Sequence, residues 1–211
     1  LQSIPEELFD NCINVIDMAG VFSSCTSLAS IPKNLFANNI NVTNFSSAFA
    51  SCRSLVNIPE TLFTNNIEVT SFLNIFQNDN KLDSIPSNLF STNTKVTTFG
   101  GAFSSCTGLT SIPSTLFVNN TIVTNFSFTF SGCYNITSIP NELFVNNREV
   151  TTFANLFNNC TSLTGNTPTT DGLQLWERAG QTSYPTSIFG TRCFGNCINL
   201  SNYSSIPSGW K

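Results

Sequence analysis

Hydrophobic positions recur along this chain with a period of 27 residues. An isoleucine followed by proline opens each period, and the apolar and polar positions between two such pairs keep the same order. A fixed period of about 20 to 50 residues predicts a solenoid of stacked coils, in which neighbouring units share one core. The isoleucines that mark the period are Ile4, Ile31, Ile58, Ile85, Ile112 and Ile139.

Each unit follows the pattern I-P-x-x-L-F-x-N-N-x-x-V-T-x-F-x-x-x-F-x-x-C-x-x-L-x-x. L-x-x-I-P predicts a short extended stretch, and its proline suits the first position of a helical turn through Leu-Phe. V-T-x-F predicts a second short strand, because Val, Thr and Phe suit a pleated surface. F-x-x-x-F-x-x-C has apolar residues at i, i+4 and i+7, which predicts one or two helical turns.

These elements predict an α/β leucine-rich-repeat solenoid of 27-residue coils, built from short parallel strands and short helical turns. Residues 1–164 form six such repeats, and residues 165–211 form a longer, atypical capping repeat of the same domain. Strands in neighbouring coils should lie about 4.8 Å apart, so roughly seven layers give a rod or arc of about 30 to 35 Å.

The segment F-x-x-C-x-x-L-x-x-I-P, seen at residues 49–59 as FASCRSLVNIP, resembles the BspA-type leucine-rich repeats of bacterial surface proteins. The resemblance covers residues 1 to about 163 and part of the tail. The unit is longer than the commonest form of that family, because L-F-x-N-N is inserted, and its strand carries little charge. The resemblance implies a curved solenoid used for adhesion or recognition.

Charge excludes one class of partner. Only 9% of the residues are charged, the net charge is −4, and no basic run could neutralise a series of phosphates, so we expect no nucleic-acid partner.

No apolar segment reaches the ~20 residues that a membrane span needs, so we expect no membrane insertion. Leu1 replaces an initiator methionine and falls on the repeat's leucine position, so we expect a cut or processed chain that has lost a targeting segment.

One repeat position holds cysteine in most coils. It predicts buried free thiols, because neighbouring Cβ atoms in register lie farther apart than the ~3.8 Å typical of a disulfide. Asp79 replaces cysteine in the third coil. The column, referred to below as the cysteine column, comprises Cys25, Cys52, Cys106, Cys133, Cys160 and Cys197.

Two polar columns accompany it. The asparagines should turn inward to bond backbone groups left unpaired at a bend. The threonines form either a solvent-facing β-branched row or a regular hydroxyl array that could bind glycan or ice. The asparagine column is Asn39, Asn66, Asn93, Asn120 and Asn147, and the threonine column is Thr43, Thr70, Thr97, Thr124 and Thr151.

The sequence does not indicate an enzyme. Histidine, the commonest general base, is absent, and no serine has a recurrent lysine or carboxylate neighbour. We therefore expect no catalytic residues, no metal and no cofactor. The segment NDNKLD at residues 78–83 loosely resembles a calcium loop, but it lacks the ligand spacing and glycine of an EF-hand, which favours a solvated turn.

Recognition residues are expected beside the coil's leucine, because the strand there lies in the concave face of leucine-rich solenoids. This surface is mostly small and polar, so the larger or charged side chains on it are the candidates. They are Arg53, Asn57, Lys81, Asp83 and Tyr134.

The last coil breaks the period, since Cys160 and Cys197 lie 37 residues apart. A terminal repeat must cover the open end of the core, which explains aromatic bulk there. A long loop on a solenoid is the alternative, and it would make this insert a binding loop. Its candidate ligand-binding residues are Trp176, Arg178 and Tyr184.

These observations predict a non-enzymatic recognition or adhesion module of a bacterial cell-surface protein or a bacteriophage fibre. Its partner would be a protein or carbohydrate on a host or bacterial surface, and the domain would be an extracellular or cell-surface monomer. Two alternatives remain open. One is a purely structural spacer without a ligand, and the other is glycan or ice binding through the threonine column.

Overall fold

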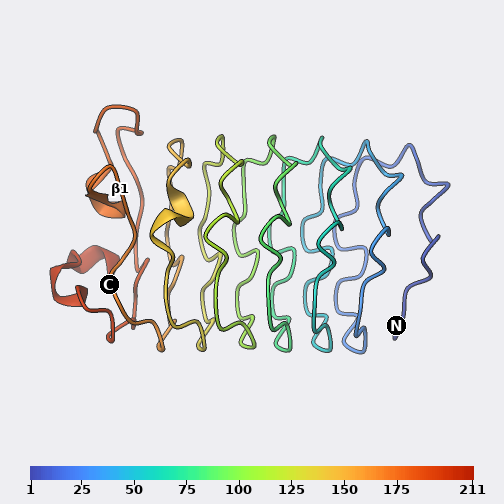
Figure 1. The fold of residues 1–211 in the computed structure, drawn as a ribbon, viewed down its shortest axis with the longest axis horizontal. Helices are drawn as coiled ribbons and strands as arrows, with labels where there is room; N and C mark the ends of the chain where they lie inside the picture. The colour runs from blue at the N-terminus through green and yellow to red at the C-terminus, as the bar shows by residue number, and fades with distance from the viewer.

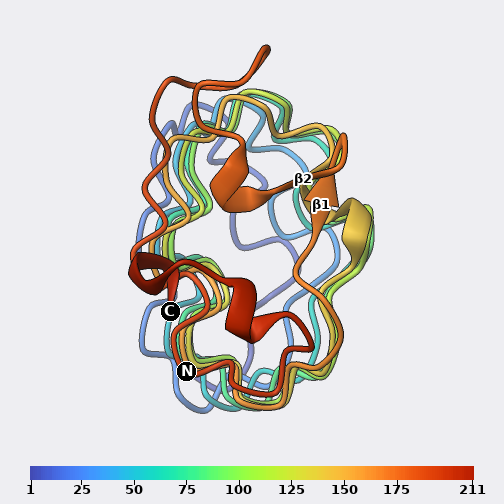
Figure 2. The ribbon, with the colours of Figure 1, turned by 90° about the vertical axis from the view of Figure 1, so that its left-hand side faces the viewer.

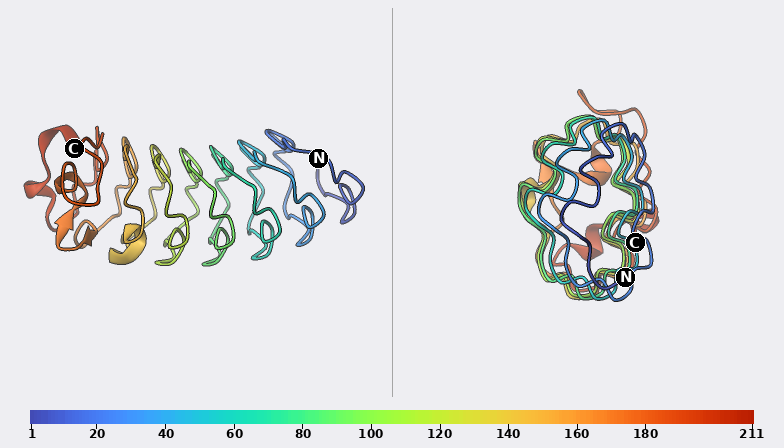
Figure 3. Two further views of the ribbon diagram at one scale, coloured as in Figure 1. Left: turned by 90° about the horizontal axis from the view of Figure 1, so that it is seen from above. Right: turned by 90° about the vertical axis from the view of Figure 1, so that its right-hand side faces the viewer.

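The computed structural model describes residues 1–211 as a single stack of coils. Successive coils lie side by side along one axis, with the chain ends at opposite ends of the stack (Figure 1). Viewed along that axis, the coils superpose as one closed oval (Figure 2), and the stack as a whole bends gently (Figure 3). Each coil therefore contacts the coil before it and the coil after it.

A parallel bridge joins each coil to the next at the third residue of V-T-x-F. Most bridged residues lie 27 positions apart, and the last pair spans the longer final coil. The bridged pairs are Asp17 and Asn44, Asn44 and Ser71, Ser71 and Thr98, Thr98 and Asn125, Asn125 and Thr152, and Thr152 and Phe189.

Hydrogen bonds between coils continue from V-T-x-F through F-x-x-x-F-x-x-C. In the second coil the N–H groups of Phe45, Ser47, Phe49 and Ser51 donate to carbonyls of the next coil. The residues between them bond within the coil, as Ala48 N–H does to the carbonyl of Phe45. Alternate residues thus bond along the stack and around the coil.

This arrangement corrects the predicted helical turn in F-x-x-x-F-x-x-C. Ser47 and Ser51 have left-handed φ values of 57° and 65°, and the equivalent residues of the other coils are also left-handed. A helix cannot hold a left-handed residue in every turn, because an L side chain there meets its own carbonyl. The apolar spacing that suggests a helix comes instead from a chain of tight turns.

Regular elements are few, so the predicted α/β class is also corrected. The chain has no α-helix, and L-x-x-I-P forms no strand, although single hydrogen bonds such as Asp83 N–H to Val56 O still link some coils there. The elements present are the 3₁₀ helices η1 (Asn141–Phe144), η2 (Leu175–Glu177), η3 (Tyr203–Ser205) and η4 (Ser208–Trp210) and the antiparallel strands β1 (Thr169–Thr170) and β2 (Leu173–Gln174).

Phenylalanine fills the core in three columns that run along the stack. Rings in one column stack nearly parallel, as Phe49 and Phe76 do at 5.7 Å between ring centroids, and rings of different columns meet at steeper angles. Offset and edge-on pairs at these separations add to the stabilisation from burial. The columns share one hydrophobic cluster of 53 buried residues that extends through all the coils.

The asparagine column points inward, as predicted. Asn66 Nδ2, for example, donates to the carbonyls of Phe36 and Asn39, and the other members repeat this pair of bonds. Each amide therefore ties its coil to two carbonyls of the preceding turn.

The cysteine column is free of disulfides, which confirms the prediction of free thiols. Four thiols of this column donate to the carbonyl of the phenylalanine 30 residues earlier, as Cys106 Sγ does to Phe76 O at 3.0 Å, and Cys197 donates to Phe157 O across the longer final coil. Burial raises the pKa of the Cys133 thiol to about 12, so these groups stay protonated near neutral pH.

The final coil closes the stack with aromatic rings. Trp176 of η2 packs edge-on against Phe194 and against Trp210, each at 6.2 Å between ring centroids. Its position after the buried Leu175 matches the Leu-Phe pair of the other coils in sequence, but its ring meets Phe194, which stacks on Phe157 in a different phenylalanine column. The hairpin of β1 and β2 leads into η2 and belongs to the same cap.

Candidate functional site

The residues predicted beside the leucine column lie on the surface but do not converge. Arg53, Asn57, Lys81, Asp83 and Tyr134 are all exposed, and none of them lines a hollow. The only side-chain hydrogen bond among them is the one that Asp83 accepts from its neighbour Ser84. This face is therefore an open surface with separate polar groups.

The C-terminal insert, in contrast, builds a connected cluster around Tyr184. Asp171 bridges two partners, because its Oδ2 lies 2.6 Å from Arg148 Nη2 and accepts a 3.5 Å hydrogen bond from the Tyr184 hydroxyl. The Arg148 guanidinium lies 5.2 Å from the centroid of the Tyr184 ring, within range for cation–π attraction. The hydrogen bond to Asp171 is the main cause that raises the pKa of Arg148.

A hollow of about 630 Å³ opens beside this cluster, and we call it the Tyr184 hollow. Arg148 and Tyr184 form part of its wall, and Thr124 and Thr151 of the threonine column form another part. Its volume falls within the range of small-ligand sites, although it is open rather than enclosed. The insert and the regular coils meet here, so this hollow depends on both.

Arg178 lies inside the cap instead of on the surface, which corrects its prediction as a ligand contact. Its side chain is 1% exposed, and it donates to Thr170 Oγ1 at 2.6 Å and to the Phe144 carbonyl at 3.5 Å. Asn147 makes the equivalent bond to Phe117 one coil earlier, so Arg178 ends the asparagine column. Desolvation lowers its pKa to about 10.

Trp176 is also engaged within the cap. It is partly buried against the core cluster through the edge-on contacts described above. These contacts support the capping interpretation of the aromatic residues in the tail. Of the three insert residues singled out from the sequence, Tyr184 alone lines a surface hollow.

The threonine column is less available than its regular spacing suggests. Each hydroxyl donates to a carbonyl of the preceding coil, as Thr70 Oγ1 does to Thr43 O and Thr97 Oγ1 does to Thr70 O. Thr43, Thr124 and Thr151 make the same bond. The hydroxyl protons are therefore used within the protein, and only acceptor lone pairs face outward.

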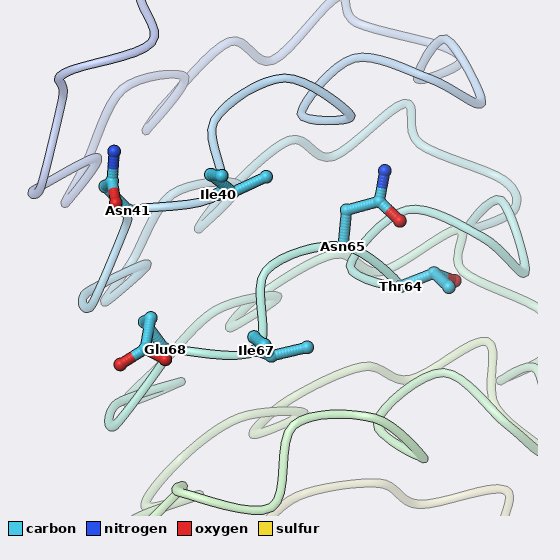
Figure 4. Close-up of a pocket in the computed structure, with 6 residues that line it drawn as sticks. All are labelled: Ile40, Asn41, Thr64, Asn65, Ile67 and Glu68. Carbon is cyan, nitrogen blue, oxygen red and sulfur yellow. The ribbon is translucent and has the colours of Figure 1, made fainter.

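A third surface carries exposed isoleucines on neighbouring coils. Ile40 and Ile67 project side by side, with Asn41 and Glu68 beyond them and Thr64 and Asn65 beside them (Figure 4). Both isoleucines are about half exposed, and Ile13 continues the row on the preceding coil. The row ends at the fourth coil, where Thr94 takes the position.

The acidic segment at residues 78–83 is not wholly solvated, because Asp79 and Leu82 are both buried. Asp79 is fully buried, and desolvation raises its pKa to about 8, while Asp83 lies on the surface. A buried protonated carboxyl is a poor calcium ligand. The chain contains no group of three or more His, Cys, Asp or Glu side chains placed to hold a metal ion.

Two residues of interest were not predicted from the sequence. Arg148 follows the asparagine column, where other coils carry isoleucine or threonine, so the change in residue type was its only signal. Phe128 is an exposed aromatic residue with a left-handed φ of 61°, and it stands where other coils mostly carry Gly, Ser or Asn. Neither change of residue type in the sequence indicates a ligand by itself, because the neighbours of these residues are known only from the fold.

No protein-family model matches this chain, and no curated protein matches it. None of its helices has the length and apolar character that crossing a membrane requires.

Several solved structures show a partial likeness to this chain. In the Drosophila Toll–Spatzle complex the likeness covers 81% of this chain and 23% of the matched chain, with 20% identity and a TM-score of 0.45. For the Arabidopsis receptor kinase HAESA with the peptide hormone IDA and the co-receptor SERK1, the likeness covers 94% of this chain and 31% of the matched chain, with 21% identity and a TM-score of 0.46. For the leucine-rich repeat domain of APL1B, the likeness covers 77% of this chain and 39% of the matched chain, with 15% identity and a TM-score of 0.38.

The chain thus spans between about a quarter and two fifths of these three solved chains. The APL1B structure is by name a leucine-rich repeat domain. Because all three TM-scores are below 0.5, these likenesses assign no fold family, ligand or partner to this chain.

Proposed function

We propose that this chain is a non-enzymatic recognition or adhesion module whose binding site includes the Tyr184 hollow. The bacterial surface protein or phage fibre suggested by the resemblance to BspA-type repeats is part of the proposal, as is a protein or glycan partner on the opposing surface. An extracellular or cell-surface location and a monomeric state complete it.

The observation that carries the proposal is the cluster of Arg148, Asp171 and Tyr184. Tyrosine and arginine are the residues that most often dominate recognition surfaces, and here they are already held in place by a 2.6 Å ion pair and a stacked ring. Such preorganisation lowers the entropy lost when a partner binds. The insert that breaks the 27-residue period supplies Asp171 and Tyr184.

A regular solenoid suits this role, because its core and its surface are set by different positions. The buried columns repeat from coil to coil, while the exposed residues beside the leucine column change from Arg53 to Lys81 to Tyr134 at neighbouring positions. Surface residues can therefore vary without disturbing the packing. This separation also supports Arg53, Asn57, Lys81, Asp83 and Tyr134 as a second contact surface.

An array of glycans and of bacterial and host surface proteins tests the proposal. It is probed with the unchanged domain, with a Tyr184→Ala, Arg148→Ala variant, and with a variant carrying alanine at Arg53, Lys81, Asp83 and Tyr134. Each variant serves as a matched control for the other, because both remove exposed charged and aromatic side chains. Circular dichroism first verifies that all three proteins are folded.

We expect a specific hit that the Tyr184, Arg148 variant loses and the second variant keeps. A hit lost only in the second variant would move the site to the leucine face. A hit that survives both but is lost on Thr70→Val, Thr97→Val replacement would favour the threonine column. The absence of any hit for the unchanged domain would overturn recognition and favour a structural spacer.

A further inference from the structure

Phe128 combines backbone strain with an unburied aromatic ring. Its φ is 61°, in the left-handed region that costs a bulky L residue energy, and its side chain is 48% exposed. At the same position other coils carry Gly20, Ser47, Asn74 or Gly101, which tolerate this conformation better. The ring gains little burial in return, so packing does not explain the residue.

A hollow of about 440 Å³ adjoins this ring, and we call it the Phe128 hollow. Its floor is the pair Gly100 and Gly101, and Leu73 and Phe128 line it from the coils on either side. A Cβ atom at Gly101 would overlap the side chain of Asn74, and one at Gly100 would come within 3.0 Å of Leu73 Cδ1. The two glycines therefore keep the hollow open.

Unpaired amide groups line the same hollow. The side chains of Asn74 and Gln77 form no hydrogen bond within the protein, and Asn125 uses only its Oδ1, which accepts the Ser127 N–H at 2.8 Å. None of the lining residues carries a charge. The hollow thus offers several hydrogen-bond donors and acceptors to a neutral, polar ligand.

The backbone of the floor is already paired, which excludes one common kind of occupant. Gly101 N–H donates to Ser127 O, and Gly100 O accepts from Asn74 N–H, each at 2.8 Å. An extended peptide that adds to a sheet edge needs free backbone groups. Recognition here must therefore use the aromatic face and the side-chain amides.

We propose that the Phe128 hollow binds a neutral sugar residue of a glycan. The apolar C–H face of a pyranose ring would pack against Phe128, and its hydroxyl groups would bond to the amides of Asn74, Gln77 and Asn125. A hydroxyl both donates and accepts, as a primary amide does, so the two are matched. The inference rests on the proposed recognition function, but it places the contact away from Tyr184.

Saturation-transfer NMR tests this directly on the full 211-residue chain. The probes are glucose, galactose, mannose, N-acetylglucosamine, lactose and chitobiose, each tested singly, with sialyllactose as an anionic comparison. We expect transfer to the ring C–H protons of at least one neutral probe, and weaker transfer to the anionic one. No transfer from any neutral probe would overturn the inference.

Two variants locate the contact. Phe128→Asn keeps a residue that accepts the left-handed backbone, so we expect unchanged or higher thermal stability together with about tenfold weaker binding, as removal of an aromatic contact implies. Gly100→Ser fills the floor and should weaken binding similarly. Ser47→Asn, at the position equivalent to Phe128 in another coil, is the matched control and should change neither property.

The results separate this inference from the broader proposal. Sugar binding that survives both Phe128→Asn and Gly100→Ser overturns the Phe128 hollow as the site, and so does a fall in the thermal midpoint of Phe128→Asn without loss of binding. An array hit lost in the Tyr184, Arg148 variant but kept in Phe128→Asn supports the proposed function independently. A protein partner lost in Phe128→Asn, with no sugar bound, would replace the glycan as occupant and overturn the inference.

Discussion

Trp210 covers Gly190 so closely that the indole ring occupies the space a side chain at position 190 would need. Position 190 continues the column of Phe126 and Phe153, and the absence of a side chain there lets the ring of Trp210 lie against the backbone instead. The glycine and the tryptophan thus act together to end the phenylalanine column.

Replacement of Gly190 by alanine should loosen this end of the molecule. The added methyl must displace the Trp210 ring, and overpacking of this kind costs about 1–3 kcal/mol of unfolding free energy. Urea unfolding followed by tryptophan fluorescence measures the loss. Gly209→Ala is the control, because nothing lies within 4 Å of the added atom. Equal stability of the two variants would contradict the contact.

The buried carboxyl of Asp79 should make stability depend on pH. Its pKa rises from 3.8 to about 8 on folding, so the folded protein binds the proton more tightly than the unfolded chain. The resulting stabilisation is complete below pH 4 and is lost as pH rises toward 8, by at most about 1.4 kcal/mol per pH unit. At the equivalent position most other coils have a thiol that donates a hydrogen bond to a carbonyl. A carboxyl group can donate such a bond only when it is protonated.

Asp79→Cys restores the cysteine column and removes this titration. We expect the variant to show a flatter stability profile between pH 5 and 8 and to exceed the parent protein most at pH 8. The column thiols do not disturb this window, since the pKa of Cys133, for example, lies near 12. Parallel profiles for the two proteins in chemical unfolding would show that Asp79 is not the titrating group.

The asparagine column should contribute far more than the asparagines beside it. Asn65 and Asn66 each donate to a carbonyl of the preceding coil, but Asn66 is fully buried and makes two such bonds, while Asn65 is exposed. Asn66→Ala should therefore lower the free energy of unfolding by about 1–3 kcal/mol. Asn65→Ala should change it by no more than about 0.5 kcal/mol. Thermal unfolding of the two variants measures the difference in stability between them. Equal stability of the two variants would contradict the larger contribution of the buried asparagine.

Thiol accessibility should follow the burial of the cysteines. Of the eight cysteines, only Cys12 and Cys25 are partly exposed, and the rest are buried. A small disulfide reagent should modify at most these two rapidly in the folded protein and all eight in denaturant, because reaction needs an accessible thiolate. Rapid modification of Cys133 in the folded state would contradict its burial.

The repeat and its buried columns could be predicted from the sequence because they depend on which residues recur, whereas the local conformation could not. Phe45, Phe49 and Cys52 have helical spacing, but Ser47 and Ser51 are left-handed between them. A signal was present in the glycines at Gly20, Gly101 and Gly132 in the same two positions. Serine and asparagine at the other copies hid it, since both also occur in helices.

The candidate site was less predictable, because it depends on the coil in which the period fails. Arg178 takes the role of an asparagine only after the irregular loop brings it to the Phe144 carbonyl. Asp171 follows Arg148 by 23 residues and Tyr184 follows Asp171 by 13, spacings that the 27-residue period does not describe. The polarity of these residues predicts that they are exposed. That Arg148, Asp171 and Tyr184 lie together is known only from the fold.

The constant spacing of the contacts between coils has a consequence for how such a gene can change. Most hydrogen bonds between coils join residues 26 to 30 positions apart, so an in-frame duplication or loss of one 27-residue unit alters no type of contact. Unequal crossing-over between the similar DNA repeats would lengthen or shorten the protein by whole coils. Each new copy would then be free to acquire its own surface residues while the shared interior remained under selection.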